Sequence, residues 1–536
     1  MTKPVVLAIL DGWGIALSGP GNAVSLAKTP NFDSFWAAFP HTQLQASGEV
    51  VGLPRGEVGN SETGHLNLGA GRIVYQDLPR IDMSIADGSF FENSALLSAV
   101  AHCQKNKSAL HLLGLLGQGG VHSNIAHLFA LLRLAKDKKL DNVYLHLFSD
   151  GRDSPQTSCP LYLSQLEKVM KDLNVGKVAT LVGRYFAMDR DNHWDRTEVA
   201  YRAIAEGKGE QVDDLKEAIQ QAYQKGKTDE FLEPLIVKGV PRVQENDAVI
   251  FFNFRIDRPR QLTKAFVIPD FKNLIGQKIA FDPYTEKYYK KTYIDTRISS
   301  IFDRGPKIKN LSFVTMTEYE NDLPVESAFP PVRIALPMGK VISEKGLRQL
   351  RLTETEKERF VTYYFNGQQE KPFSGEDRII VPSPSVATYD KQPEMSAIEV
   401  NKILEENIKQ NIYDFILVNY ANPDMVGHTG VIPAGIKACE TVDECIGRIG
   451  KIVLGMDGVL IITADHGNVE EMINLETGQI DTEHSKNPVP FIIVGKSFQG
   501  NRSTLPMGIL ADVAPTILSF LDIKRPAEML ASRLLK

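Results

Sequence analysis

The chain has 536 residues, of which 43% are apolar. This length exceeds the roughly 250–300 residues at which a single hydrophobic core stops growing, so two domains are expected. The formal net charge of −6, from 60 basic and 66 acidic residues, argues against nucleic acid or an anionic membrane surface as a partner. The four cysteines form no C-x-x-C pair, which argues against a disulfide framework and predicts a cytoplasmic location.

The first predicted element is the apolar run VVLAIL (5–10), which ends abruptly at Asp11. This run is shorter than the core of a signal peptide or a membrane span, and no later segment approaches spanning length. We therefore expect no association with a membrane and interpret the run as a buried β-strand.

Similar short apolar runs recur along the chain and alternate with segments of helical periodicity. The six runs are 5–10, 143–148, 178–182, 248–254, 414–420 and 459–464. Runs that are apolar on both faces and alternate with helices indicate parallel strands, so an α/β fold is predicted. Charged side chains follow each run, and open α/β sheets bind ligands beyond the carboxyl ends of their strands. These loops could therefore converge on one cleft.

The types of charged residue divide the chain into two domains. Carboxylates and histidines follow the runs near both ends, whereas arginines follow those in the middle. This pattern predicts a metal-binding domain, residues 1–76 and 332–536, interrupted by an anion-binding domain, residues 77–331. The junctions GRIVYQDLPR (71–80) and ESAFPPVRIALP (326–337) contain proline, which tends to break regular structure.

Six carboxylates and imidazoles in the outer segments are candidate metal ligands. The full set is Asp11, Asp424, His428, Asp465, His466 and His484. Asp424 and His428 are four residues apart, a spacing that one helical turn or a loop could direct at one ion. Asp465 and His466 are adjacent, so both reach a ligand only if the preceding strand has already ended. This mixture of ligands suits Mn²⁺ or Zn²⁺ better than Ca²⁺.

Ser61, in the stretch GEVGNSETGH (56–65), is a candidate nucleophile, although such a glycine-rich stretch can be a simple polar turn. It is not a G-x-S-x-G elbow, because Gly59 and Gly64 have the wrong offsets. Six ligands and a serine oxygen exceed the needs of one tetrahedral centre, whereas two ions about 3.5–4 Å apart would use all seven groups. Such a centre would lower the pKa of the serine hydroxyl without a histidine base.

Ten segments in order along nearly the whole chain carry a resemblance to a known family. They are LDGWG (10–14), GLPRGEVGNSETGHLNLGAGR (52–72), GGVHSN (119–124), SDGRDSP (149–155), GRYFAMDRD (183–191), NFRIDRPRQL (253–262), TETEK (353–357), NYANPDMVGH (419–428), ADHGN (464–468) and HSKNPVP (484–490). Together they resemble the cofactor-independent phosphoglycerate mutases of the alkaline phosphatase superfamily. This family interconverts 3-phosphoglycerate and 2-phosphoglycerate in glycolysis and gluconeogenesis.

The resemblance implies an alkaline-phosphatase-like domain with a mostly parallel sheet flanked by helices, into which a second α/β domain is inserted. It also implies two Mn²⁺ ions, for which Zn²⁺, Co²⁺ or Mg²⁺ could substitute, and no need for 2,3-bisphosphoglycerate. One ion is assigned to Asp424, His428 and His484, and the other to Asp11, Ser61, Asp465 and His466. A monomer is implied by the same analogy.

The resemblance assigns phosphoglycerate to His122, Arg152, Asp153, Arg184, Arg190, Arg255, Arg258 and Lys357. The phosphoryl group would pass to Ser61, giving a phosphoserine, and return to the other hydroxyl of glycerate. Asp153 would carry the proton between the two hydroxyls, and Lys357 would neutralise charge on the phosphoryl group. Water must be excluded meanwhile, so the domains are expected to close over substrate, with hinges near the two junctions.

Some features depart from the family or leave alternatives open. Val58 and Thr63, beside the serine, differ from the usual family residues, and the segment 271–309 is longer than expected. Within it, the basic and aromatic stretch 284–297 could bind nucleic acid, although a solvated insertion is the preferred interpretation. The alternatives for function are a metal-dependent phosphatase, a phosphopentomutase and a catalytically silent phosphosugar sensor. The arginine loops around Arg152, Arg184 and Arg255 favour the mutase.

Overall fold

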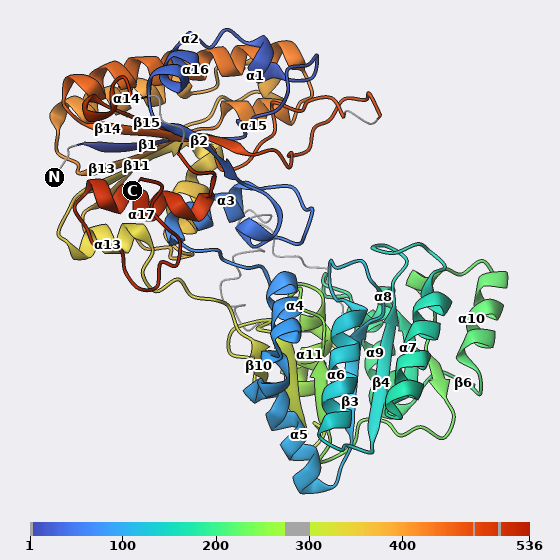
Figure 1. The fold of residues 1–536 in the computed structure, drawn as a ribbon. Helices are drawn as coiled ribbons and strands as arrows, with labels where there is room; N and C mark the ends of the chain where they lie inside the picture. Colours follow the sequence, from blue (N-terminus) through green and yellow to red (C-terminus); the bar gives the residue numbers. More distant parts are fainter. Residues whose placement is uncertain (1–3, 274–300, 475–476, 502–504, 536) are drawn as a thin grey trace. The chain divides into compact units, whose positions relative to one another are not determined.

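The computed structural model describes residues 4–273, 301–474, 477–501 and 505–535. The stretch 284–297 and most of the long segment 271–309 lie outside the described residues. The chain forms two compact units: unit 1 comprises Met1–Gln76 and Val332–Lys536, and unit 2 comprises Asp77–Pro331 (Figure 1). None of the helices in the described ranges is long and apolar enough to cross a membrane.

Unit 1 is built on an eight-stranded sheet of order β12-β11-β13-β1-β14-β15-β2-β16. In that order the strands are Glu376–Val381, Gln349–Glu354, Phe415–Tyr420, Val5–Leu10, Val459–Thr463, Val489–Gly495, His41–Gln45 and Gly508–Ile509. The first five are mutually parallel, while β15 runs antiparallel to both of its neighbours. Every residue of β1 is buried, as expected for a central strand covered on both faces.

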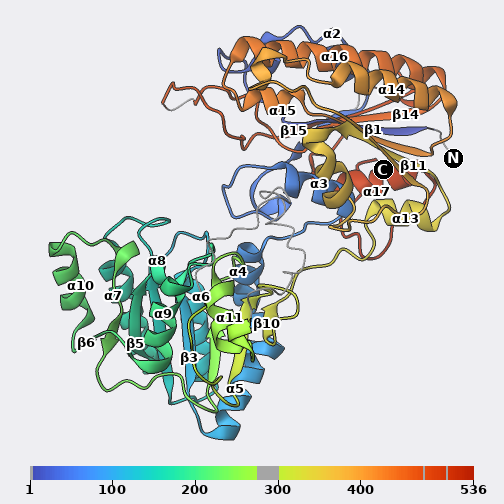
Figure 2. The same ribbon diagram turned by 180° about the vertical axis from the view of Figure 1, so that it is seen from behind.

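Helices cover both faces of this sheet (Figures 1 and 2). On one side lie α1 (Ala23–Leu26), α2 (Pro30–Ala38), α14 (Ala397–Gln410), α15 (Asn422–Gly427) and α16 (Ile432–Gly455). On the other side lie α3 (Ser61–Ala70), α13 (Met338–Glu344) and α17 (Val513–Phe520). One large apolar cluster runs through the central strands and most of these helices and forms the main core of the unit. Two smaller apolar clusters lie beside it, one around α15 and one at α3.

Unit 2 contains a second eight-stranded sheet, of order β10-β9-β8-β3-β4-β5-β7-β6. In that order the strands are Glu326–Phe329, Ser312–Thr317, Ala248–Phe251, Leu110–Leu115, Val143–Ser149, Lys177–Gly183, Leu235–Val237 and Glu210–Val212. All neighbouring pairs are parallel except β5 and β7. The predicted α/β fold with mostly parallel sheets is therefore confirmed.

Helices also cover both faces of the second sheet, over two separate apolar cores. One face carries α5 (Ser94–Asn106), α6 (Ile125–Asp137) and α7 (Cys159–Leu173), and the other carries α9 (Trp194–Glu206) and α11 (Pro259–Val267) (Figures 1 and 2). The remaining helices of the unit are α4 (Asp77–Asp87), α8 (Arg184–Ala187) and α10 (Leu215–Gln224). Both sheets thus have the buried faces that their apolar strands predicted.

All six apolar runs are strands, but one prediction of length was wrong. The run 248–254 was predicted as a single strand, whereas β8 ends at Phe251. Beyond it, Asn253 accepts a hydrogen bond from the backbone N–H of Leu115 through its side chain, and Phe254 donates its backbone N–H to His122. Beyond Phe251 the chain is thus held by a side-chain bond to the last residue of β3 and by a bond to the loop of His122, in place of the regular strand ladder.

Candidate functional site

The loops at the carboxyl ends of three adjacent strands of unit 1 carry the candidate metal ligands. Asp11 follows β1, Asp424 lies in α15 after β13, and Asp465 and His466 follow the end of β14 at Thr463. Because β1 pairs with both β13 and β14, these loops emerge side by side. The strand β14 has ended before Asp465, as the adjacent pair of ligands requires.

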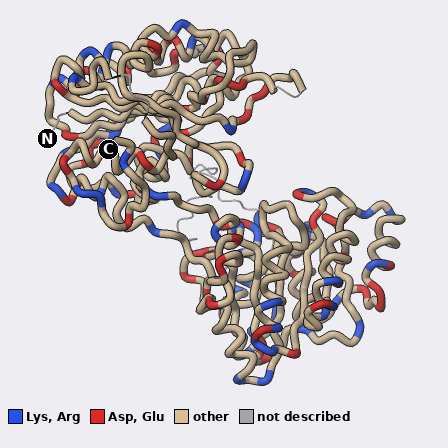
Figure 3. The backbone as a smooth tube through the Cα atoms, in the orientation of Figure 1, with Lys and Arg blue, Asp and Glu red and all other residues tan. Residues whose placement is uncertain are grey.

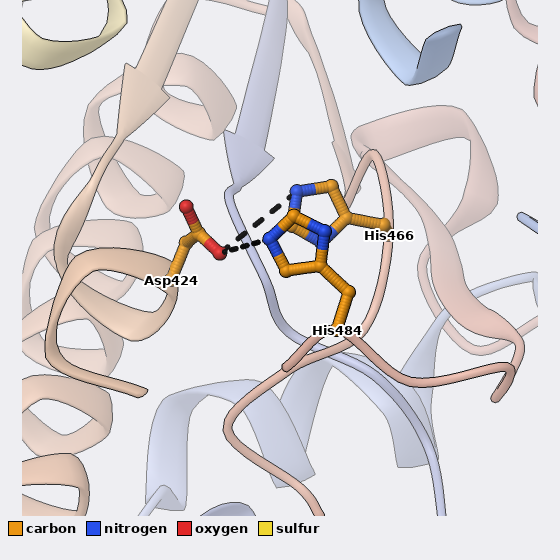
Figure 4. A group of neighbouring side chains, drawn as sticks. All are labelled: Asp424, His466 and His484. Atoms are coloured by element: carbon orange, nitrogen blue, oxygen red, sulfur yellow. Dashed lines mark ion pairs between the residues drawn. The ribbon is translucent and has the colours of Figure 1, made fainter. Parts of the chain in front are cut away.

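Two groups of ligand atoms can be separated within this cluster. In one, Asp424, His466 and His484 converge (Figure 4); in the other, Asp11, Asp465 and His466 do so, and within each group the ligand atoms lie within 4.8 Å of one another. Oδ1 of Asp424 lies 3.1 Å from Nε2 of His484 and 3.9 Å from Nε2 of His466. His466 is shared by the two groups, so the structure brings these five residues into one cluster.

His428 joins the cluster from the end of a helix. Asp424 lies inside α15 and His428 follows its last residue, so the two share a face one turn apart. Nε2 of His428 lies 3.3 Å from Oδ1 of Asp424 and 3.1 Å from Nε2 of His484. The hydrogen bond to Asp424 raises the pKa of His428, while burial opposes the shift.

Ser61 lies at the first position of α3, with its hydroxyl directed at the same cluster. Oγ of Ser61 lies 2.9 Å from Nε2 of His466 and 3.4 Å from Oδ1 of Asp11. The preceding residue Asn60 caps the helix by accepting from the backbone N–H of Thr63 at 2.9 Å. The positive end of the helix dipole therefore favours negative charge at the serine oxygen.

Lys357 supplies the one ammonium group that the described part of the chain places in this cluster. The resemblance grouped it with the substrate ligands, and the structure places it in unit 1, where Nζ donates to Asp11 at 2.6 Å, to Asp424 at 2.6 Å and to Ser61 at 2.9 Å. Burial lowers the pKa of Lys357, but Asp11 and Asp424 outweigh this effect and raise it well above its ordinary value. The side chain is therefore a buried cation.

The electrostatics of the cluster favour bound cations. Three buried carboxylates, Asp11, Asp424 and Asp465, face one buried ammonium among the residues that the structure describes, that of Lys357. Burial, followed by repulsion from Asp465, raises the pKa of Asp11, whereas Lys357 and the histidines hold the pKa of Asp424 low against the effect of burial. Such an excess of buried negative charge is costly unless positive charge compensates it.

The carboxylate of Asp465 provides a direct test of fit for a metal ion. It is fully buried, and neither oxygen accepts a hydrogen bond from any residue that the structure describes. Oδ2 lies 3.1 Å from Nδ1 of His65, within ion-pair distance but without hydrogen-bond geometry. Buried carboxylate oxygens in native proteins are normally paired or coordinate a metal, and the Asp, His and Ser donors suit Mn²⁺ or Zn²⁺. The residues present therefore fit a divalent metal centre.

The arginines predicted to bind an anion gather in unit 2, again at the carboxyl ends of strands. Arg152 and Asp153 follow β4, Arg184 begins α8 after β5, and Arg255 follows β8. Nη1 of Arg184 donates to Asp150 at 2.5 Å and to Asp153 at 2.6 Å. The guanidinium group thus fixes the loop that carries Asp153.

A second carboxylate, Asp257, joins three of the other predicted residues. It lies 2.9 Å from Nη1 of Arg190, 3.4 Å from Nε of Arg255 and 3.6 Å from Nδ1 of His122. Burial lowers the pKa of His122 to about 4; Asp257 opposes this shift, while Arg184 and Arg255 add to it. His122 is therefore neutral near pH 7 and can donate or accept a hydrogen bond.

The last two predicted residues of unit 2 lie at the margins of this arginine cluster. Nε of Arg152 donates to Glu230 at 2.6 Å, and Nη1 of Arg258 donates to the backbone oxygen of Met188 at 3.0 Å. Burial lowers the pKa of Arg258, and repulsion from Arg184 and Arg190 lowers it further. The guanidinium group of Arg258 therefore lies within electrostatic range of Arg184 and Arg190.

Several residues that organise these sites were not singled out from the sequence. In unit 2 they are Asp150, Glu230 and Asp257, and in unit 1 they are His65, Asn419 and Glu470. Asn419 donates to Oδ2 of Asp11 at 2.7 Å and lies 3.0 Å from Nε2 of His65. A polar residue at the end of an otherwise apolar strand was the available signal for Asn419.

Known proteins resemble this chain over its whole length. It is 50% identical over 543 residues to the 2,3-bisphosphoglycerate-independent phosphoglycerate mutase of Chloroflexus aggregans, covering 99% of this chain and 98% of that protein. The enzyme of the same name from Clostridium botulinum is 48% identical over 539 residues, covering 100% of this chain and 99% of that protein. The chain belongs to the 2,3-bisphosphoglycerate-independent phosphoglycerate mutase family. The resemblance inferred from the sequence is thus confirmed.

Two further comparisons agree with membership of the phosphoglycerate mutase family. The family described as BPG-independent PGAM N-terminus matches residues 81–321, within unit 2. Among solved structures, a Leishmania mexicana phosphoglycerate mutase, crystallised at low cobalt concentration, is similar with a TM-score of 0.57 and 29% sequence identity. That similarity covers 99% of this chain and 97% of the Leishmania protein.

Proposed function

We propose that this member of the phosphoglycerate mutase family interconverts 3-phosphoglycerate and 2-phosphoglycerate through a phosphoserine at Ser61, without 2,3-bisphosphoglycerate. One observation carries the proposal: Oγ of Ser61, at the N-terminus of α3, lies 2.9 Å from both Nζ of Lys357 and Nε2 of His466. A hydroxyl beside a buried ammonium and a helix N-terminus is well placed to receive a phosphoryl group.

We assign one Mn²⁺ to Asp11, Ser61, Asp465 and His466 and a second to Asp424, His428 and His484, with Zn²⁺, Co²⁺ or Mg²⁺ as substitutes. When bound, the ions would supply positive charge that lowers the pKa of the Ser61 hydroxyl and screens the phosphate. Two observations support this assignment: the oxygens of Asp465 accept no hydrogen bond from the described residues, and carboxylates outnumber ammonium groups in the cluster.

The serine then acts twice. In the first step Oγ of Ser61, which has lost its proton to solvent, attacks phosphorus. The bond from phosphorus to the substrate oxygen breaks, and that oxygen gains a proton through Asp153. In the second step the neighbouring hydroxyl of glycerate loses its proton and attacks the phosphoserine, and the serine oxygen leaves. The ammonium of Lys357 offsets the charge on the phosphoryl oxygens in both steps. Phosphoryl transfer requires mainly that the reacting groups are positioned and that this charge is stabilised.

The arginine cluster of unit 2 is proposed to bind the carboxylate and phosphate of the substrate. Planar guanidinium groups hold such anions with paired hydrogen bonds, which suits Arg152, Arg190, Arg255 and Arg258. Asp153 would move the proton between the two hydroxyls of glycerate, and the neutral imidazole of His122 would orient them. Arg184, which bonds Asp153 at 2.6 Å, would hold that carboxylate in place.

Further predictions concern the partners and location of the protein. Basic and acidic residues are interspersed over both units (Figure 3), which gives no support for a nucleic-acid surface among the described residues. We propose a small-molecule substrate as the sole partner, a cytoplasmic location and a monomer. Closure of the two units over substrate stays a prediction.

Substitution of Ser61 tests the proposed route. We expect Ser61→Ala with Mn²⁺ to lose conversion of 3-phosphoglycerate to 2-phosphoglycerate, and excess chelator to abolish it in the unsubstituted protein. The matched control is Ser164→Ala, an exposed serine in α7 of unit 2. Activity surviving in Ser61→Ala would rule out the phosphoserine. In the unsubstituted protein, release of inorganic phosphate without the isomer would favour the phosphatase. Turnover of pentose phosphate would favour the phosphopentomutase, and binding of phosphoglycerate without turnover would favour the sensor.

A further inference from the structure

Glu470 is a buried carboxylate of unit 1 with hydrogen bonds to both of its oxygens, and it lies outside the set of proposed metal ligands. Oε2 accepts from the backbone N–H of Gly14 at 2.9 Å and from that of Asn468 at 2.8 Å. Oε1 accepts from the hydroxyl of Ser485 and from Nδ2 of Asn487 at 3.0 Å. Only 2% of the residue is exposed, so these bonds are shielded from water.

The donors to this carboxylate come from three separate loops, and each loop carries proposed metal ligands. Gly14 follows Asp11 by three residues, Asn468 follows His466 by two, and Ser485 directly follows His484. Gly14 and Glu470 are 456 residues apart in the sequence. One side chain thus joins the loops that supply both of the proposed ions.

The packing around this carboxylate leaves little room for movement. A Cβ atom at Gly14 would lie 2.2 Å from Cδ of Glu470, and one at Gly467 would lie 2.3 Å from Oε1 of Glu470. Such separations are far shorter than real carbon contacts, so the carboxylate occupies the space that side chains at these two positions would need. The two glycines and Glu470 therefore form one fitted unit.

Further hydrogen bonds connect the same loops to one another and to the segment before Ser61. Asn468 donates its backbone N–H to Gly12 at 2.9 Å, and Ser485 donates its own to Gly467 at 3.0 Å. Nδ1 of His484 lies 2.8 Å from the backbone oxygen of Gly59, two residues before Ser61. A shift of Glu470 would therefore move ligand-bearing backbone on more than one strand end.

We propose that Glu470 is a positioning residue that sets the spacing of the three ligand-bearing loops and so determines the affinity of the centre for Mn²⁺. It touches none of the reacting atoms, because both of its oxygens are already occupied by donors from the loops. The inference rests on the metal centre of the proposed function. Residues that orient metal ligands from behind typically change metal affinity or activity by about 10- to 100-fold when substituted.

The test measures Mn²⁺ binding to metal-free protein by calorimetry, with Mn²⁺ alone as the probe. We expect Glu470→Ala to weaken Mn²⁺ binding by about 10- to 100-fold. Glu470→Gln should lose less Mn²⁺ affinity than Glu470→Ala, because its amide oxygen can still accept hydrogen bonds from the two backbone N–H groups. The matched control is Glu471→Gln, which removes the neighbouring, half-exposed carboxylate that bonds Asn487 at 2.8 Å and should leave Mn²⁺ binding unchanged.

Thermal unfolding and Mn²⁺ affinity together distinguish a merely structural role of Glu470 from a positioning role. If the midpoint of thermal unfolding in chelator falls while Mn²⁺ binds with unchanged affinity, the inference is wrong. If Glu470→Ala does not fold, the Glu470→Gln variant decides: wild-type Mn²⁺ affinity would overturn the inference, and weakened affinity would support it. Absence of Mn²⁺ binding in the unsubstituted protein would instead overturn the metal centre itself, and the inference with it.

Discussion

Nζ of Lys357 donates a hydrogen bond of 2.6 Å to Oδ1 of Asp11, although the two residues are 346 positions apart in the chain. Lys357 ends the short helical turn Thr355–Lys357 that follows β11, and Asp11 follows β1. Between these strands in the sheet lies β13, which is followed by Asp424, the other carboxylate that the ammonium contacts. The lysine therefore compensates charge that two different strand ends bring together.

Lys357→Met should impair both stability and activity, because it leaves Asp11 and Asp424 buried without their cation. Breaking a buried pair by removing one partner costs about 3–5 kcal/mol of unfolding free energy. Loss of one charge-stabilising group at the phosphoryl oxygens should lower kcat by about 100- to 1,000-fold. Urea unfolding of metal-free protein and assays with Mn²⁺ measure the two effects.

The matched control for this prediction is Lys402→Met, which removes an exposed lysine of α14. It should change neither the free energy of unfolding nor kcat appreciably, since exposed charges contribute little. An unfolding free energy of Lys357→Met equal to that of the control would show that the ammonium does not compensate the two carboxylates.

Glu354 predicts a measurable dependence of stability on pH. It ends β11 and is 1% exposed, and burial raises its pKa from 4.5 to about 7, although hydrogen bonds from Ser383 and Ser396 oppose the shift. The folded protein thus holds this proton more tightly than the unfolded chain does. The contribution of Glu354 to the free energy of unfolding is therefore greatest below pH 4.5 and is lost as the pH rises to about 7.

Glu354→Gln should consequently stabilise the protein at pH 8 by up to about 3 kcal/mol and have little effect near pH 4.5. Urea unfolding of metal-free protein at several pH values measures the difference between the variant and the unsubstituted protein. The control Glu358→Gln, at an exposed position nearby, should show no such pH-dependent difference. A difference that is constant from pH 5 to pH 8 would contradict the raised pKa of Glu354.

Arg184→Lys should weaken substrate binding, although it keeps the positive charge. The guanidinium of Arg184 donates to both Asp150 and Asp153, and a lysine on a flexible stem cannot reproduce that planar geometry. Loss of a charged hydrogen bond worth about 1.5–3 kcal/mol should raise KM for 3-phosphoglycerate about 10- to 100-fold. Steady-state kinetics with Mn²⁺ measure the change.

Arg196→Lys is the control for the loss of an arginine in the same unit. Arg196 pairs with Asp189 at 3.2 Å and stacks on Tyr185, and it is not among the proposed substrate ligands. Its substitution should leave KM nearly unchanged. Equal KM values for the two variants would exclude a role of Arg184 in holding the loop of Asp153.

Much of the fold could be predicted from local patterns. Runs such as VVLAIL (5–10) are apolar at every position, which marks strands buried on both faces, and all six of them are strands. The neighbouring residues Asp465 and His466 also indicated that β14 ends before them, because consecutive side chains of a strand point to opposite faces. The roles assigned to the predicted domains and site residues stay predictions.

The partners of these residues could not be predicted in the same way. Glu470 and Glu471 are adjacent and chemically identical, yet the first is buried among donors from three loops and the second is half-exposed. Asp257 was not singled out from the sequence, although its carboxylate contacts both Arg190 and His122 in the structure. A sequence does not distinguish such residues, because burial depends on what the rest of the chain places around them.

The sequence by itself determined the strands, the family and the chemical types of the candidate ligands, because these follow from local hydrophobicity and from motifs within short segments. The tertiary structure decided which side chains meet. The sheet order that places β1 between β13 and β14, and so joins Asp11 to Asp424 and Asp465, arises from packing between distant parts of the chain. Packing of this kind also changes pKa values: against the effect of burial, carboxylates from distant segments raise the pKa of Lys357, whereas burial and neighbouring carboxylates together raise that of Asp11.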